Sequence, residues 1–150
     1  MAYGSKLKQD GAYIYCIIGD GESQEGQIWE AAMLAGHKKL DRLIAFTDYN
    51  KLELDGYIED YNDLAPLKEK WKAFRWNVLE IDGNDVSAVV SAIAEAKQSK
   101  DKPTMILLHT LKGKGVSFIE KNPLGNHHMA IDAGDLDCAL QELKESQEEC

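Results

Sequence analysis

The sequence alternates between short apolar runs and longer amphipathic segments. The short runs predict β-strands at residues 13–18, 43–46, 77–82 and 104–110, and the longer segments predict helices at residues 26–39, 63–76, 86–96 and late in 131–149. Residues 1–9 are predicted to be the tail of a helix. Because strands and helices alternate at the spacing of parallel βαβ units, the pattern predicts an α/β fold with a mainly parallel sheet.

Several of these segments are expected to be buried. The runs at 13–18, which contains Cys16, and at 43–46 are apolar, as in buried strands. Small or apolar residues surround most of helix 26–39, which is typical of a buried helix. Asp85 can cap the helix that follows it, and the side chains of that helix predicted to face inward are Val86, Val89, Val90 and Ile93.

Helix 63–76 carries its own start signals. Asp63 can cap it and Pro66 fits its first turn. One face of this helix is predicted to pack in the core, and it consists of Leu67, Trp71 and Phe74. The last helix carries a comparable apolar stripe made of Leu136, Leu140 and Leu143.

Two polar side chains directly follow neighbouring apolar runs. Asp20 follows the first run and Asn50 follows the second, and ligands of open α/β sheets bind at the carboxyl ends of the strands. A carboxylate and an amide oxygen suit Mg²⁺ or Ca²⁺, and Gly19 and Gly21 allow a diphosphate to approach the backbone. The spacing therefore favours a metal-bridged diphosphate site. The alternative is that Asp20 only caps the following helix.

A second polar segment follows the strand at 104–110. The run Lys112–Gly115 places two cations and two glycines in one loop, which suits a phosphate group. It lacks the spacing of a P-loop, and loop lysines by themselves are usually solvated. His127 and His128 come after a turn-rich loop, with no third ligand that would suggest zinc. His109, near the end of the strand, is interpreted as structural.

Composition and charge limit the classes of partner. At 150 residues the chain is one domain, residues 1–150. Its formal net charge of −9 disfavours nucleic acid and anionic membranes. No apolar run is long enough to cross a membrane and no signal peptide is visible. Cys16, Cys138 and Cys150 have no metal or redox spacing, so we expect reduced thiols in a cytoplasmic protein.

Taken together, these motifs resemble a known family. The segments Gly19-Asp20-Gly21, Glu25-Gly26, Trp29–Ala32 and Asp48-Tyr49-Asn50 resemble the thiamine diphosphate motif of transketolases, and the similarity continues to His127-His128. The match is most similar to the N-terminal subunit of split transketolases. The resemblance implies a three-layer α/β/α diphosphate-binding fold. It also implies that the fold is incomplete at its N-terminus, with a sheet edge that we expect self-association to cover.

The resemblance assigns roles to individual residues. It implies that the metal is held by Asp20, Asn50 and the carbonyl of Leu52. It also implies that the catalytic residues are His127 and Lys112, which it places near the reacting or phosphate groups. His127 is expected to face the site, although the family usually has a glycine where this chain has His128. The full set implied to contact thiamine diphosphate is Gly19, Asp20, Gly21, Glu22, Asn50, Leu52 and His127.

The implied activity is transfer of a two-carbon ketol unit from a ketose phosphate to an aldose phosphate, as in the pentose phosphate pathway. The implied cofactors are thiamine diphosphate and Mg²⁺ (or Ca²⁺). In transketolases a glutamate from a pyrimidine-binding domain activates the cofactor, and no such domain is recognised here. We therefore expect a partner, the C-terminal transketolase subunit that carries the pyrimidine domain, and no turnover without it. We also expect a homo-oligomer, with helix 26–39 at the dimer interface.

Two alternatives remain at this point. The α-subunit of a 2-oxo acid dehydrogenase shares the Gly-Asp-Gly to Asn arrangement, although the segment from Lys112 to His128 resembles transketolase more. The second alternative is a folded fragment that has an incomplete site and no catalytic activity.

Overall fold

The computed structural model describes residues 1–54 and 56–148, the last two by their backbone only. Cys150, which is expected to be a reduced thiol, lies outside the described residues, as does Asp55. Cys16 and Cys138 are free thiols, as expected. None of the described helices combines the length and the hydropathy that crossing a bilayer requires.

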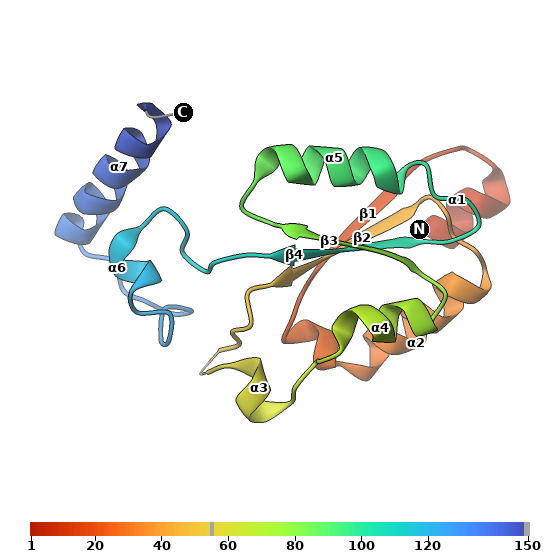
Figure 1. Ribbon diagram of the computed structural model, residues 1–150, viewed down its shortest axis with the longest axis horizontal. Helices are drawn as coiled ribbons and strands as arrows, with labels where there is room; N and C mark the ends of the chain where they lie inside the picture. The colour runs from red at the N-terminus through yellow and green to blue at the C-terminus, as the bar shows by residue number, and fades with distance from the viewer. Residues whose placement is uncertain (55, 149–150) are drawn as a thin grey trace.

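A four-stranded parallel sheet forms the centre of the molecule (Figure 1). Its strands are β1 (Ile14–Gly19), β2 (Leu43–Tyr49), β3 (Asn77–Asp82) and β4 (Thr104–His109), in the spatial order β1-β2-β4-β3. All three pairings are parallel. The predicted α/β class and parallel sheet are therefore confirmed. The carboxyl ends of all four strands meet along one edge of the sheet.

Helices cover both faces of the sheet, which gives the expected three layers. Helix α5 (Val86–Ala96) lies on one face, and α2 (Gly26–His37) and α4 (Leu67–Ala73) lie on the other (Figure 1). Beyond the carboxyl end of β4, the chain continues into two helices that stand away from the sheet. The remaining elements are α1 (Ala2–Lys8), the 3-10 helix η1 (Glu22–Gln24), α3 (Ile58–Tyr61), α6 (Ser117–Glu120) and α7 (Ala133–Glu148).

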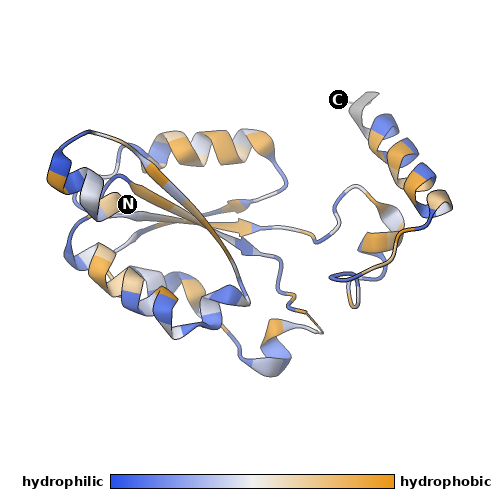
Figure 2. Ribbon diagram, turned by 180° about the vertical axis from the view of Figure 1, so that it is seen from behind, coloured by the Kyte–Doolittle hydropathy of each residue, from blue (hydrophilic) through white to orange (hydrophobic). Residues whose placement is uncertain are grey.

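Apolar side chains form one cluster on each face of the sheet, and Figure 2 shows the strands and α5 as largely hydrophobic. On the α2 and α4 face, Trp71 and Trp76 pack edge to face with ring centroids 4.8 Å apart, over buried Met105 and Leu107. On the α5 face, the buried cluster consists of Ile44, Phe46, Ala92, Ala96 and Ile106. The core-packing prediction for helix 63–76 is confirmed at Leu67 and Trp71, which are buried, and Phe74 packs against them.

Strand β1 is more exposed than its apolar sequence predicts. Ile17 is 73% exposed and Tyr15 is 48% exposed, and Cys16, expected in a buried strand, is also exposed. The reason is position: β1 is an edge strand, and the cluster beneath α5 is centred on β2 and β4. An apolar sequence identifies a strand but does not say whether its neighbours cover it.

Helix α5 is rotated relative to the prediction. Asp85 caps it as expected, accepting hydrogen bonds from the backbone N–H groups of Ser87 and Ala88. However, Val86 and Val90 are 76% and 62% exposed, so the prediction that they face inward is wrong. The buried positions are Ala92 and Ala96, with Val89 and Ile93 half-buried. Small alanine side chains bring this helix close to the sheet.

The helix predicted at 63–76 is shorter, because α4 runs only from Leu67 to Ala73. Asp63 does not cap it; its side chain accepts a hydrogen bond of 2.8 Å from the N–H of Ala65 and closes a preceding turn. Pro66, expected inside the first turn, has extended backbone angles just before the helix. Arg75 ends the helical segment with a positive φ of 69°.

Helix α2 uses its small residues within this chain. Ala32, Ala35 and Gly36 are buried, and the indole N–H of Trp76 donates a 2.9 Å hydrogen bond to the carbonyl of Ala32. Packing within this chain is therefore enough to account for the small residues of α2, without a dimer interface. The outer face of α2 carries exposed apolar side chains, because Met33 and Leu34 are 57% and 52% exposed.

Helix α7 follows the predicted range, but its leucine stripe is not buried. Leu136, Leu140 and Leu143 are 51%, 46% and 38% exposed. The helix is joined to α6 by Glu142, whose carboxylate accepts hydrogen bonds of 2.6 Å from both the N–H and the hydroxyl of Ser117. This contact holds α7 beside the segment that follows β4.

His109 is structural, as interpreted: its Nε2 lies 3.0 Å from Glu80 Oε1, and Lys68 Nζ lies 2.9 Å from Glu80 Oε2. Lys68, and then His109, lower the pKa of the Glu80 carboxyl. The stabilisation is present above the ordinary glutamate pKa and is lost as the pH falls through the lowered pKa. We expect Glu80→Gln to lower the free energy of unfolding near neutral pH by less than about 1 kcal/mol, because the pair is partly exposed.

Denaturant unfolding of the wild type and Glu80→Gln at neutral and strongly acidic pH tests this expectation. The two proteins should differ at neutral pH and converge in acid. A difference that persists in acid would show that packing, not the ion pairs of Glu80, carries the effect.

Candidate functional site

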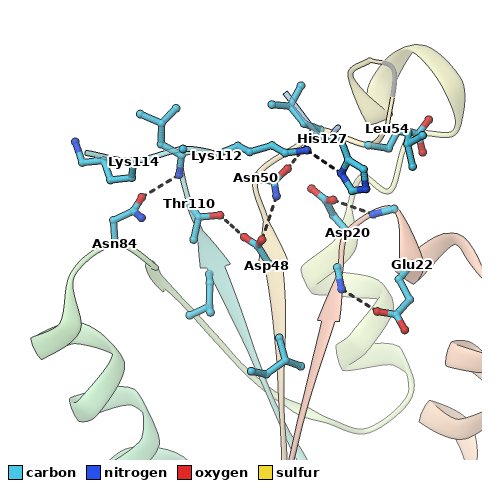
Figure 3. A pocket seen from close by; sticks show the side chains of 18 of the residues that line it. Asp20, Glu22, Asp48, Asn50, Leu54, Asn84, Thr110, Lys112, Lys114 and His127 are labelled. Carbon is cyan, nitrogen blue, oxygen red and sulfur yellow. Dashed lines mark hydrogen bonds between the residues drawn. The ribbon is translucent and has the colours of Figure 1, made fainter. Parts of the chain in front are cut away.

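A large open cleft lies at the carboxyl edge of the sheet, where the sequence predicts a ligand site. Its volume is about 1140 Å³. The ends of β1 and β2 form one wall, and the segment after β4 forms the other (Figure 3). The predicted residues that line this cleft are Gly19, Asp20, Gly21, Glu22, Asn50, Leu52, Lys112 and His127.

Asp20 lies at the base of this cleft and is only 2% exposed. Its Oδ1 accepts a 2.8 Å hydrogen bond from the N–H of Gly21, and its Oδ2 accepts a 2.5 Å hydrogen bond from the N–H of Lys51. Burial raises the pKa of the Asp20 carboxyl, the two backbone hydrogen bonds lower it, and the charge of Asp48 raises it further, with a net upward shift. A buried carboxylate with this balance is stabilised by a bound cation.

The loop after β1 is fixed by its own side chains. The hydroxyl of Ser23, fully buried, donates a 2.8 Å hydrogen bond to the carbonyl of Gly19. Glu22 Oε2 accepts a 3.1 Å hydrogen bond from the N–H of Gly19, so the structure uses Glu22 to hold the loop. Helix α2 begins only after Glu25 and has no side-chain cap. The alternative in which Asp20 caps this helix is wrong.

Asn50 lies beside Asp20 on the same wall of the cleft, just after the end of β2 (Figure 3). Its side-chain oxygen accepts a 2.8 Å hydrogen bond from the N–H of Leu52. Between them, Lys51 adopts a left-handed conformation with φ of 64°, which directs its N–H to Asp20. A strained backbone residue at such a position is typical of functional sites. Leu52 itself is buried at 7% exposure.

Gly21 lies at a close approach between two loops beside Asp20. A Cβ atom at this position would lie 3.3 Å from Cβ of Glu53, which is tighter than an ordinary contact. The loop from β1 and the loop after β2 therefore approach each other closely where the backbone is bare. The absence of a side chain at Gly21 is what permits this close approach.

Lys112 and His127 meet on the opposite wall. Lys112 Nζ lies 3.4 Å from Nδ1 of His127 (Figure 3). His127 lines the cleft, and His128 packs edge to face against it without lining the cleft. Lys114 also lines the cleft, and its Nζ lies 3.8 Å from Glu120 Oε1. Positive charge is thus concentrated at one wall of an otherwise acidic protein.

Three further polar residues line the cleft without a role predicted from the sequence. Asp48 belongs to the motif Asp48-Tyr49-Asn50 but was given no role, and Thr110 and Asn84 were not identified. Asp48 and Asn50 are two residues apart along an extended chain, a spacing that places both side chains on one side and could have revealed the pair. Thr110 reaches the cleft from the end of β4, and Asn84 Oδ1 accepts a 2.9 Å hydrogen bond from the N–H of Leu111. Asn84 follows β3 and Thr110 follows β4, so the signal that found Asp20 and Asn50, a polar side chain just after a strand, could also have found these two.

The donor set fits a hard cation that bridges to a diphosphate. Among residues 1–54 and 56–148, no three His, Cys, Asp or Glu side chains gather as a complete metal site. The site instead offers one carboxylate (Asp20), one amide oxygen (Asn50) and the backbone at Leu52. Each oxygen of Asp20 and Asn50 keeps a lone pair beyond its hydrogen bond. Such a set needs further oxygen ligands from water or phosphate, as Mg²⁺ sites commonly have.

Comparison with protein families decides which diphosphate site this is. Residues 4–146 match the family model described as "Transketolase, thiamine diphosphate binding domain". The chain belongs to the transketolase family. The match extends from α1 into α7 and contains every residue of the cleft. The predicted thiamine diphosphate-binding domain is therefore confirmed.

Two transketolase relatives are subunits of split enzymes. The chain is 55% identical over 131 residues to the 6-deoxy-6-sulfo-D-fructose transketolase subunit SqwG of a Clostridium species, covering 87% of this chain and 47% of that protein. It is 44% identical over 142 residues to an apulose-4-phosphate transketolase subunit of Actinobacillus succinogenes, covering 95% of this chain and 49% of that protein. The chain thus spans about half the length of these relatives.

The fold also matches transketolases of known structure. The transketolase of Campylobacter jejuni superposes with a TM-score of 0.76 at 32% sequence identity. The superposition covers 84% of this chain and 20% of that chain. The parallel sheet with helices on both faces is therefore the transketolase diphosphate-binding architecture.

Proposed function

We propose that this chain is the part of a split transketolase that binds thiamine diphosphate through Mg²⁺. The observation that carries the proposal is the pairing of buried Asp20 with Asn50 at the base of a large cleft. Transketolase family membership favours this function over the α-subunit of a 2-oxo acid dehydrogenase. The complete reaction would transfer a two-carbon ketol unit from a ketose to an aldose phosphate.

The residues of the cleft divide into proposed metal ligands, a loop beside the diphosphate, and a wall that would face the substrate. Asp20, Asn50 and the carbonyl of Leu52 would hold Mg²⁺, and Gly19, Gly21 and Glu22 would form the loop beside the diphosphate. When bound, the cofactor supplies the nucleophilic carbon and the electron sink that C–C bond cleavage requires. Lys112 and His127 would contact anionic or reacting groups of the substrate from the opposite wall.

The substrate class follows from charge. The chain has a formal net charge of −9, yet Lys112, Lys114 and His127 line one wall of the cleft. This local positive charge suits a sugar with an anionic end group. A phosphate and a sulfonate both meet that requirement, and the two relatives are named for a sulfonated ketose and for a phosphorylated sugar.

A second subunit that carries the pyrimidine domain is proposed as the partner, because the relatives are named as subunits. We also propose that this chain forms a homo-oligomer. The exposed apolar residues of the β1 edge and of α2 support association of this kind, and they include Tyr15, Ile17, Met33 and Leu34. A cytoplasmic location is part of the same proposal.

The test is a ketol-transfer assay with this chain alone, and with the pyrimidine-domain subunit, thiamine diphosphate and Mg²⁺ added. Xylulose 5-phosphate and 6-deoxy-6-sulfo-D-fructose serve as alternative donors. We expect no turnover above background for the chain alone and turnover for the pair, because the pyrimidine domain that activates the cofactor is proposed to come from the partner. Turnover by the chain alone would contradict the split-enzyme proposal.

Calorimetry with thiamine diphosphate and Mg²⁺ provides the control for an inactive mixture. A chain that binds both but is not activated by the partner retains the cofactor-binding role only. A chain that binds neither, alone or with the partner, would be a non-catalytic folded fragment.

A further inference from the structure

We infer that Asp48 is a positioning residue that holds both side-chain metal ligands of this site in place. The inference rests on the proposed Mg²⁺–thiamine diphosphate function and deepens it. Asp48 lies in β2, lines the cleft and is half-buried. Its backbone contacts one proposed ligand, and its side chain contacts the other.

The backbone contact fixes Asp20. The carbonyl of Asp48 accepts a 3.2 Å hydrogen bond from the N–H of Asp20, immediately after the parallel pairing of Gly19 with Asp48. This bond extends the β1–β2 ladder by one step into the loop. The Asp20 carboxylate therefore leaves the sheet at a position set by β2.

The side-chain contact fixes Asn50. Asp48 Oδ2 accepts a 3.1 Å hydrogen bond from Nδ2 of Asn50. The other carboxylate oxygen of Asp48 accepts a hydrogen bond from the hydroxyl of Thr110, just beyond β4. Figure 3 shows the three side chains in a row, with Asp48 between Thr110 and Asn50. Thr110 thus orients the carboxylate of Asp48, which in turn orients the side-chain amide of Asn50.

The partners on its two sides determine the orientation of the Asn50 amide. A carboxylate can only accept, so Asp48 must face the NH₂ group of Asn50. The N–H of Leu52 can only donate, so it must face the amide oxygen, at 2.8 Å. A flipped amide would set oxygen against carboxylate and NH₂ against N–H. The two partners therefore fix which end of the Asn50 amide is oxygen and which is NH₂ before any metal binds.

This arrangement resembles the outer-shell support that metal sites generally use. Loss of such a residue typically weakens metal affinity by about 10- to 100-fold while the ligands themselves remain. Asp48 fits this role because both of its oxygens are occupied by neutral donors of the protein. Its negative charge also favours a cation beside Asp20.

The experiment measures Mg²⁺ affinity by calorimetry at a fixed excess of thiamine diphosphate, with the full chain. The main variants are Asp48→Ala, which removes the acceptor, and Asp48→Asn, which keeps an acceptor oxygen for the Asn50 amide. Thr110→Val removes the hydroxyl that holds Asp48, and Thr110→Ser keeps it. Asp41→Ala is the matched control, because it removes a carboxylate that precedes β2 at the opposite end of the sheet.

We expect Asp48→Ala to weaken Mg²⁺ affinity about 10- to 100-fold, and Asp48→Asn to weaken it less. Thr110→Val should weaken it several-fold, with recovery in Thr110→Ser. Asp41→Ala should leave it unchanged. The thermal midpoint of each variant without ligands separates this effect from a general loss of stability. The rescue by serine is the result that a merely structural role would not give.

Three outcomes overturn the inference alone: wild-type affinity in Asp48→Ala, equal losses in Asp48→Asn and Asp48→Ala, or equal losses in Thr110→Val and Thr110→Ser. If Asp48→Ala does not fold, the two threonine variants decide the matter by themselves. A wild-type chain that binds neither Mg²⁺ nor thiamine diphosphate would overturn the proposed function, and the inference with it.

Discussion

Replacing Asp20 by alanine should weaken the binding of Mg²⁺ with thiamine diphosphate at least about 100-fold, which corresponds to about 2.7 kcal/mol. Asp20 is the one carboxylate of the proposed ligand set, and it is almost completely buried at 2% exposure. Its removal leaves Asn50 and the Leu52 carbonyl, which are neutral, to hold a divalent cation. Calorimetric titration of the wild-type and Asp20→Ala chains measures the change.

Two further measurements sharpen the role of Asp20. Asp20→Asn keeps the shape of the side chain but not its charge, and it should lose affinity nearly as much as Asp20→Ala. Asp41→Ala is a matched control, because Asp41 precedes β2 at the opposite end of the sheet. Unchanged affinity in Asp20→Ala would contradict the central assignment of the site.

The same carboxyl gives the binding a characteristic pH dependence. Burial, the largest cause, raises the pKa of Asp20, and a ligand must be deprotonated to bind metal. Metal affinity should therefore begin to fall, as the pH is lowered, above the ordinary aspartate pKa of about 3.9. Affinity that stays constant down to that value would show that Asp20 does not act as a ligand.

Replacing Gly36 by alanine should destabilise the fold by about 3 kcal/mol or more, at the upper end of overpacking effects. A Cβ atom at Gly36 would lie 1.9 Å from the carbonyl oxygen of Phe74 and 3.1 Å from its carbonyl carbon. Both atoms belong to the backbone, so no side-chain rotation can relieve the contact. Helix α2 and the end of α4 would have to move apart, which would also disturb the packing of Trp71 and Trp76 between them and the sheet.

Thermal unfolding measures this effect, with an expected decrease of about 2–4 °C for each kcal/mol in a chain of this size. Gly4→Ala is the matched control, because Gly4 lies in α1 and a Cβ atom added there would meet nothing within 4 Å. Alanine is favoured over glycine in a helix by about 1 kcal/mol, so this variant should be neutral or slightly stabilising. Equal midpoints for Gly36→Ala and the wild type would show that the two helices can separate freely.

The sequence by itself determined the order of the main elements and the residues proposed to carry the chemistry. Periodicity located β1 to β4 and the helices α2, α4, α5 and α7, and the cap Asp85 marked the start of α5, whereas α3 and α6 were not predicted. Asp20 and Asn50 were found because each directly follows a strand. The resemblance to transketolases, carried by Gly19-Asp20-Gly21 and Asp48-Tyr49-Asn50, identified the family, which the family match then confirmed.

The tertiary structure decided what depends on neighbours. An apolar run does not reveal whether its strand is central, so β1 was expected to be buried although Ile17 is 73% exposed. The side of α5 that faces the sheet was also misjudged, because valine and alanine are both apolar and only packing distance selects the smaller. Asp48 gained its role only when Thr110, 62 residues away, was seen beside it. Contacts between distant strands leave no local pattern, and here they hold in place the proposed metal ligands that the sequence had named.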